Sequence, residues 1–257
     1  MCDLAGKHGL VLGIANKRSI LWGVAQAAAA SGARLALTYP SERLEENVRE
    51  LAQKLENPLV LPCDVANDQQ ITDLAASIDK EFGGLDFVVH GAAFAPSEAL
   101  SNPFVDTSRE AFRVALDISA YSLIALTRAT APLMAKRGGG SIVTMTFIGS
   151  DRVFPNYNVM GIAKAALESS VRYLASEMGP RNIRVNAISA GAIKTLASAG
   201  ISGFSSMLQI YRERAPLRRG VDQSEVADAA LFLLSNASRA ITGEVMMVDS
   251  GYHVMGL

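Results

Sequence analysis

The sequence predicts an α/β protein built on one doubly wound parallel sheet of seven strands, with helices on both faces. Three observations indicate this. Short apolar segments alternate along the chain with longer amphipathic ones. Several of the short segments are apolar almost throughout, as strands are when helices cover both faces of their sheet. The repeated strand, helix, strand order is typical of a parallel sheet.

The strands and helices can be placed in chain order from their patterns. The strands are expected at 8–14, 33–39, 58–65, 85–92, 140–147, 183–190 and 244–250. The first helix should follow the segment 13–23 and run to about Ser31. Two later helices carry a start signal that resembles a capping box, Thr107 with Glu110 and Asp222 with Glu225. No linker or internal repeat divides the chain, which predicts a single domain over 1–257.

Composition excludes several classes of function. The chain has 257 residues, 49% hydrophobic and 19% charged, and its net charge of −1 argues against a nucleic-acid surface. Cys2 and Cys63 are too few for a disulfide framework and too far apart for a zinc site, so no metal is expected. Lys17 and Arg18 interrupt the apolar N-terminal run, and the other apolar runs are also interrupted. We therefore expect a cytoplasmic protein that does not enter a membrane.

The ends of the first two strands are the expected place for a dinucleotide, because doubly wound sheets bind ligands beyond the carboxyl ends of their strands. Gly13, followed by Ser19 and Ile20 at the helix start, would let main-chain amides approach a pyrophosphate. The usual GxGxxG spacing is absent, so a plain strand-to-helix turn is the alternative. After the second strand, Pro40 and Ser41 offer no cation, which favours NADH over NADPH; Arg43 could reach a phosphate only if the following helix points that way.

The next two strand ends add candidate cofactor contacts. Asp64, before Val65, could accept a hydrogen bond from an adenine amino group, or it could simply start a helix. Gly91 and Ala92 are small enough for a ribose or nicotinamide to approach closely. His90 is interpreted as a core histidine, because no acidic residue or second histidine lies beside it.

Tyr157 and Lys164 are seven positions apart. On an α-helix this spacing is nearly two turns, so both side chains should leave the same face and could converge on one small molecule. The alternative is a solvated helix face, where Tyr and Lys at this spacing are common.

These segments together resemble the short-chain dehydrogenase/reductase superfamily with its Rossmann-like fold, and more closely its enoyl-acyl-carrier-protein reductases of bacterial fatty-acid synthesis. Most of the superfamily spaces its Tyr and Lys four apart, whereas this branch uses seven, as here. The motifs that carry the resemblance lie at 13–20, 63–65, 94–96, 155–164, 185–196 and 243–245.

The resemblance implies that hydride passes from NADH to the β-carbon of a trans-2-enoyl thioester and leaves an enolate. Tyr157 would then stabilise the enolate oxygen, and Lys164 would hold the nicotinamide ribose. The main chain at Ile193 would bind the carboxamide and Thr195 the pyrophosphate. The implied cofactor contacts are Gly13, Ser19, Ile20, Asp64, Val65, Gly91, Ala92, Lys164, Ile193 and Thr195.

The substrate side differs from the family pattern at two places. Phe147 stands where many members have a second Tyr, and it cannot supply a proton, so its expected role is apolar contact with the acyl chain or nicotinamide. The stretch at about 195–212 carries an apolar stripe that resembles the family's substrate lid, with core packing as the alternative. The expected substrate contacts are Ala95, Phe147, Met160, Ile201 and Phe204.

The expected partners are an acyl-carrier-protein or coenzyme A thioester and further copies of the chain in a homotetramer. Carrier docking is left open, because basic residues lie beside the lid stripe and not within it. The apolar segment 245–257 could help to bury the subunit interface. Two other functions compete, a reductase of other carbonyls or alkenes and a non-catalytic nucleotide sensor.

Overall fold

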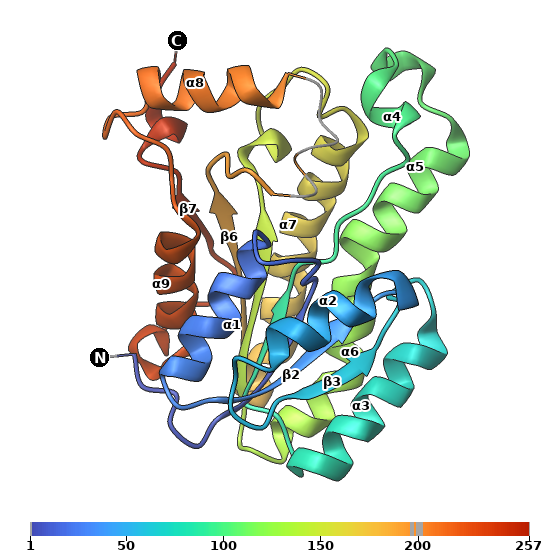
Figure 1. Cartoon of the computed structure of the whole chain (residues 1–257), viewed down its shortest axis with the longest axis vertical. Coiled ribbons are helices and arrows are strands. Elements are labelled where there is room, and N and C mark those ends of the chain that lie inside the picture. The colour runs from blue at the N-terminus through green and yellow to red at the C-terminus, as the bar shows by residue number, and fades with distance from the viewer. Residues whose placement is uncertain (1, 196–197, 199–202, 257) are drawn as a thin grey trace.

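The computed structural model describes residues 2–195, 198 and 203–256, and the described chain is organised around one sheet (Figure 1). All six strand pairings are parallel, and the strand order is β3-β2-β1-β4-β5-β6-β7. The predicted seven-stranded doubly wound sheet is therefore confirmed. The strands are β1 His8–Leu12, β2 Arg34–Tyr39, β3 Leu59–Pro62, β4 Phe87–His90, β5 Gly140–Thr146, β6 Ile183–Ala190 and β7 Val245–Val248.

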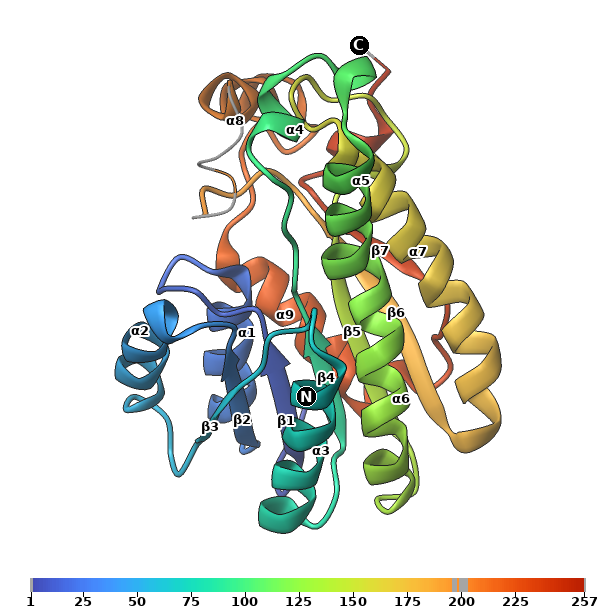
Figure 2. The same ribbon diagram turned by 90° about the vertical axis from the view of Figure 1, so that its right-hand side faces the viewer.

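Helices cover both faces of this sheet, as the continuously apolar strands predicted (Figures 1 and 2). The α-helices are α1 Ile20–Ala30, α2 Glu42–Ala52, α3 Asp68–Phe82, α4 Glu98–Ser101, α5 Arg109–Leu116, α6 Ser122–Ala135, α7 Val159–Met178, α8 Phe204–Arg214 and α9 Gln223–Leu234. A π-helical turn, η2 Asp117–Tyr121, joins α5 to α6. Short 3₁₀ turns are η1 Phe104–Asp106, η3 Ile148–Ser150, η4 Gly179–Arg181, η6 Asn236–Ser238 and η7 Tyr252–Val254.

The two faces bury separate apolar cores, because successive side chains of a strand point to opposite faces. On one face α1, α2 and α9 pack on residues such as Val89 and Val143. On the other face α3, α6 and α7 pack on their neighbours in sequence, such as Val88 and Ile142.

The helix start signals are half right. Asp222 and Glu225 form the predicted capping box at the start of α9. Thr107 does not cap α5, because it closes the preceding turn η1, and the N-cap is Ser108, whose hydroxyl accepts the amide proton of Ala111 at 3.1 Å. Both residue types accept amide protons at helix starts, so the sequence left a one-residue ambiguity.

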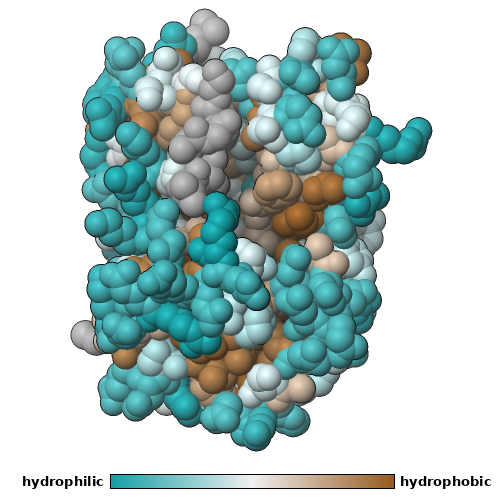
Figure 3. All heavy atoms as spheres, turned by 45° about the vertical axis from the view of Figure 1, so that its right-hand side comes forward, coloured by the Kyte–Doolittle hydropathy of each residue, from teal (hydrophilic) through white to brown (hydrophobic). Residues whose placement is uncertain are grey.

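No helix among the described residues is long and apolar enough to cross a membrane. A space-filling view shows apolar surface breaking the polar cover near the middle of one face of the molecule (Figure 3). The loop that follows β4 contributes exposed apolar surface, since Phe94 is 52% exposed.

Candidate active site

The strand order changes direction between β1 and β4, and the loops that follow these two strands meet there. Gly13 has φ +113°, and a Cβ on it would lie 2.7 Å from the carbonyl carbon and oxygen of Gly91. A Cβ on Gly91 would in turn lie 2.6 Å from the Leu21 side chain. A side chain at Gly13 would clash with main chain, so the two glycines allow the loops after β1 and β4 to pack closely at the place where such sheets bind dinucleotides.

Ser19 holds the loop between β1 and α1. It is buried, and its hydroxyl accepts the amide protons of Ala15 at 3.0 Å and Asn16 at 3.1 Å. Its own carbonyl accepts a hydrogen bond from the Gln223 side chain of α9. Ile20 is the first residue of α1, so the predicted phosphate site lies at the helix N-terminus.

The other predicted cofactor residues also follow strand ends. Asp64 comes after β3, where its carboxylate accepts the amide proton of Ala66 at 3.0 Å; the N-cap of α3 is Asn67, so Asp64 does not cap that helix. Val65 is buried. Ile193 and Thr195 follow β6, and the amide of Thr195 donates to the hydroxyl of Ser198 at 2.8 Å. These positions are consistent with their predicted roles, which stay predictions.

Tyr157 does not lie on the helix that carries Lys164, so the prediction that both leave one helix face is wrong. Helix α7 begins at Val159. Asn156 and Asn158, on either side of Tyr157, have φ of 63° and 42°, and this positive-φ backbone keeps Tyr157 out of the helix. Asn tolerates positive φ better than most residues. Met160 lies on α7 four residues before Lys164, while Tyr157 reaches the site from the turn.

The ring of Tyr157 is buried in a slot formed by glycine and aromatic neighbours. A Cβ on Gly149 would lie 2.6 Å from Tyr157 Cδ1, and a Cβ on Gly161 would lie 2.7 Å from the Gly149 carbonyl oxygen. Phe147 stands edge-on at 5.0 Å between ring centroids. Burial, aided by the charge of Glu168, raises the pKa of Tyr157, so the phenol keeps its proton at neutral pH. The sequence analysis missed Gly149 and Gly161.

Lys164 is buried under the end of β5. Its Nζ donates to the carbonyl oxygen of Met145 at 2.8 Å. One residue further along β5, the Thr146 hydroxyl donates to the Glu168 carboxylate at 2.6 Å. Burial lowers the pKa of Lys164 to about 8, and the charge of Glu168 opposes that shift. Glu168 was missed, although its position four residues after Lys164 places it on the same side of α7.

His90, at the end of β4, is confirmed as a core histidine. It is fully buried, and its two ring nitrogens lie 2.8 Å from the hydroxyls of Thr144 and Ser122. Burial, aided by the charge of Lys164, lowers the pKa of His90 to about 3, so the imidazole is neutral.

The predicted substrate residues lie around Tyr157 from several elements. Phe147 contacts Tyr157, Met160 is buried in the first turn of α7, and Ala95 packs on a small apolar cluster that includes Val159. Phe204 begins α8, and it packs with Phe147 against the cluster of Ala192, Met207 and Tyr211. Ile201 and most of the first part of the predicted lid lie outside the described residues.

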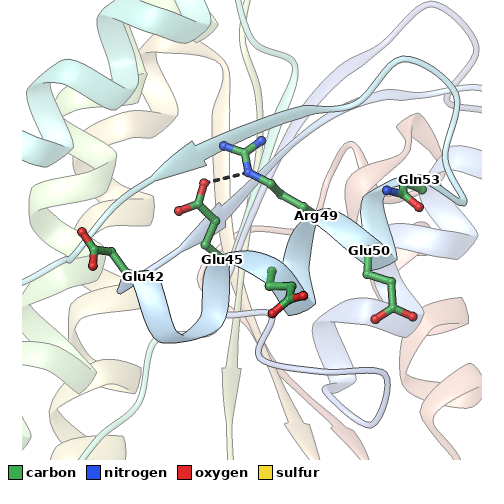
Figure 4. Close-up of a pocket in the computed structure, with 6 residues that line it drawn as sticks. Glu42, Glu45, Arg49, Glu50 and Gln53 are labelled. Carbon is green, nitrogen blue, oxygen red and sulfur yellow. Dashed lines mark hydrogen bonds and ion pairs between the residues drawn. The ribbon is translucent and has the colours of Figure 1, made fainter.

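A separate hollow lies on the outer side of α2, lined by Glu42, Glu45, Glu46, Arg49, Glu50 and Gln53 (Figure 4). Its residues come from one helix, and its ion pair joins Arg49 Nε to Glu45 Oε1 at 2.7 Å. A surface so rich in carboxylates does not suit an anionic ligand. Within the described part of the chain, no group of three or more His, Cys, Asp or Glu side chains is arranged to hold a metal ion.

Comparison with known proteins gives consistent matches over the whole chain. A family model described as "Enoyl-(Acyl carrier protein) reductase" matches residues 13–253. A Bacillus cereus protein named enoyl-[acyl-carrier-protein] reductase [NADH] FabI is 52% identical over 255 residues, 98% of this chain and 99% of that protein. A Nostoc protein of the same name is 52% identical over 260 residues, 100% of each chain.

Solved structures are equally similar. The enoyl-[acyl-carrier-protein] reductase (NADH) of Aquifex aeolicus superposes with a TM-score of 0.96 at 48% identity, covering 99% of each chain. The Bacillus cereus reductase, solved with NADP+ and indole naphthyridinone, gives a TM-score of 0.97 at 51% identity, covering 99% of this chain and 100% of that one.

Proposed function

The chain belongs to the enoyl-acyl-carrier-protein reductase family, and on that basis we propose that Tyr157 and Lys164 carry the reduction of an enoyl thioester. It is an NADH-dependent reductase of fatty-acid synthesis. The observation that carries the residue assignment is the seven-residue spacing of a buried phenol and a buried ammonium, the latter held at the end of β5 by the Met145 carbonyl. The negative charge of Glu168 raises the pKa of both groups.

The loops after β1 and β4 suit the cofactor, because Gly13 and Gly91 carry no side chains and their main chains meet where the strand order changes direction. Residues that would hold the cofactor are the amides at the start of α1, Asp64 after β3, Lys164, and the segment from Ile193 to Thr195. When bound, NADH supplies the hydride for the β-carbon of the enoyl thioester. Helix α2 begins with Glu42, and its carboxylates Glu45 and Glu46 follow, which agrees with a ribose hydroxyl at this place better than with a phosphate.

Tyr157 acts as the hydrogen-bond donor to the thioester oxygen. Its pKa is raised by burial, so the group offers a proton and not a phenolate. Negative charge grows on that oxygen in the transition state, and a fixed donor stabilises the transition state more than the ground state. Phe147 has no hydroxyl, so its part beside Tyr157 is to pack against the phenol and the apolar substrate.

Lys164 positions the cofactor. An ammonium has three protons to donate, and the contact with the Met145 carbonyl takes one of them. The remaining two can bind the nicotinamide ribose hydroxyls. The bond to Met145 fixes the direction of the side chain, so the positive charge is held in place before the ligand arrives.

The remaining proposals concern the substrate carrier, the oligomeric state and the cellular location. The substrate is an acyl-carrier-protein thioester, with coenzyme A thioesters as the alternative, and the protein is proposed to be a homotetramer. Met247 and Val254, which are 38% and 66% exposed, support the C-terminal segment 245–257 as part of the subunit interface; residue 257 lies outside the described chain. A cytoplasmic location is supported by Cys2 and Cys63, which are both free thiols.

The test is turnover of crotonyl thioesters, on acyl-carrier protein and on coenzyme A, followed by loss of NADH absorbance. Tyr157→Phe should lower kcat by about 100-fold or more and leave the Kd for NADH within about threefold. Lys164→Ala should instead weaken NADH binding. The exposed Tyr173 provides the control, since Tyr173→Phe should match the wild type. The opposite pattern for the two variants, or turnover of ketones in place of enoyl thioesters, would refute the proposal.

A further inference from the structure

The long helix from Arg109 to Ala135 is interrupted by the π-turn η2, next to the candidate site. Two of the five residues in this turn, Ser119 and Ala120, are buried. A π-turn inserts an extra residue into a helix at some cost in hydrogen bonding, and such turns are frequent at functional sites. The role of this one follows from the hydroxyls that it carries.

Ser119 is fully buried, and its hydroxyl contacts both main-chain polar groups of Phe94. Its Oγ accepts the Phe94 amide proton at 3.0 Å and lies 3.2 Å from the Phe94 carbonyl oxygen. The same Oγ lies 3.8 Å from the Met160 sulfur, at the start of α7. A single side chain therefore ties the loop after β4 to the helix that carries Lys164, although the Phe94 ring itself is half exposed.

The strand side of this loop is fixed to the same π-turn. The Ser122 hydroxyl donates to the carbonyl oxygen of Ile118 in η2 at 2.6 Å, so its oxygen accepts from His90 Nε2 at 2.8 Å. His90 Nδ1 is then an acceptor for the Thr144 hydroxyl at 2.8 Å. Every hydroxyl proton in this series of hydrogen bonds has an acceptor, so His90, the last residue of β4, is held in one position.

We propose that Ser119 is a positioning residue for the reaction: it fixes the main chain of Phe94, and with it the segment 91–95 that faces cofactor and acyl chain. The loop is anchored at His90 on one side and at Phe94 on the other, and Gly91 and Ala92 lie between the anchors. Ala95 follows directly. The inference rests on the proposed function, because these three residues are its predicted contacts. Ser119 itself does not touch the substrate.

The first test measures the loop directly and needs no turnover. In Ser119→Ala, the Phe94 amide loses its acceptor, so hydrogen–deuterium exchange of a peptide covering 91–96 should become at least about tenfold faster in the protein without ligand. The matched control is Ser170→Ala, which removes a helix serine hydroxyl bonded to the Ala166 carbonyl at 2.9 Å. Unchanged exchange in Ser119→Ala would overturn the proposal.

The second test is kinetic. Ser119→Ala should lower kcat/KM for crotonyl thioester by about tenfold or more, with kcat falling as well as KM rising, since misplacing contacts by even about 1 Å is costly. Ser119→Cys, which restores a weak donor and acceptor of similar size, should recover part of the loss. Activity that falls only in proportion to the folded fraction would make the role merely structural and overturn the proposal.

The wild-type assay separates the two ideas. A wild type without turnover on any enoyl thioester refutes the proposed function, whatever the exchange data show. A Ser119→Ala protein as active as an active wild type refutes only the positioning role.

Discussion

Two regions that meet around Tyr157 are held together in different ways. The strand-end side is fixed by directional bonds, such as Lys164 to the Met145 carbonyl at 2.8 Å and Thr146 to Glu168 at 2.6 Å. Helix α8 is held by apolar packing, with Tyr211 stacked on Tyr252 at 4.0 Å between ring centroids. The first region depends on hydrogen bonds between particular atoms, and the second depends on the apolar area that is buried. Substitutions should therefore change chemistry in one and stability in the other.

The largest expected effect comes from adding a side chain at Gly13. Gly13→Ala places a Cβ 2.7 Å from the Gly91 main chain, which cannot yield as a side chain could. We expect the Kd for NADH, measured by fluorescence titration, to rise by about 100-fold.

Gly83→Ala separates this clash from backbone strain. Gly83 also has positive φ, +69°, but nothing lies within 4 Å of its added Cβ. That variant should lose about 1 kcal/mol of stability and keep normal NADH binding. Equal NADH affinity in Gly13→Ala and wild type would show that the close approach of the loops after β1 and β4 does not shape the cofactor site.

The next effect concerns the slot of Tyr157. Gly149→Ala brings a Cβ to 2.6 Å from Tyr157 Cδ1 and must displace the ring. We expect kcat to fall by about 10- to 100-fold while the Kd for NADH changes by less than about threefold. Gly179→Ala is the control, because nothing lies within 4 Å of its added Cβ. A normal kcat in Gly149→Ala would argue against Tyr157 as the donor.

The same contrast explains what the sequence could predict. The strand ends carry chemistry that depends on residue type, so Gly13 and Gly91 could be chosen from the sequence, and the structure places them after β1 and β4. Lys164 could be chosen from its motif, and it reaches the end of β5 from α7. The sheet itself was predictable because buried parallel strands are apolar throughout.

The misses have physical causes. A spacing of seven positions from Tyr157 to Lys164 fits a helix, and the break at Asn156 and Asn158 depends on backbone angles that Asn permits without requiring. The stripe on α8 could be either lid or core, since both are apolar. The described part packs Met207 and Tyr211 as a small cluster with Phe147, and the lid role stays a prediction.

A smaller effect is expected from pH. Burial lowers the pKa of Lys164 from 10.5 to about 8. Above pH 8 the free enzyme loses the positive charge that binds the ribose, so kcat/KM for NADH should fall by up to about tenfold per pH unit. For stability the sign is opposite: the cost of burying the ammonium is full below pH 8 and is relieved as pH rises toward 10.5, because only the unfolded chain then stays protonated.

Glu168→Gln sharpens that measurement. The Glu168 charge raises the pKa of Lys164, so its removal should move the alkaline limb of the profile to lower pH. Glu177→Gln removes an exposed carboxylate from the same helix and should leave the profile unchanged. A limb that does not move in Glu168→Gln would mean that another group titrates there.

The smallest effect is expected in α8 from Tyr211→Phe. The Tyr211 ring is fully buried, and its hydroxyl has no hydrogen-bond partner among the described residues. Removing a buried polar group that lacks a partner should leave the free energy of unfolding unchanged or raise it by about 1 kcal/mol, as measured by urea denaturation. Activity should stay within about twofold.

Tyr157→Phe makes the same one-atom change on the other side, which turns the pair into a direct comparison. Both phenols are buried, so the loss of the oxygen changes packing little in either place. If the strand-end region depends on hydrogen bonds between particular atoms, Tyr157→Phe loses turnover at nearly constant stability. Tyr211→Phe should instead keep both turnover and stability. If Tyr211→Phe lowered stability by more than about 1 kcal/mol, the Tyr211 hydroxyl must bind a polar group in the native protein. Helix α8 would then be held by a hydrogen bond as well as by apolar packing.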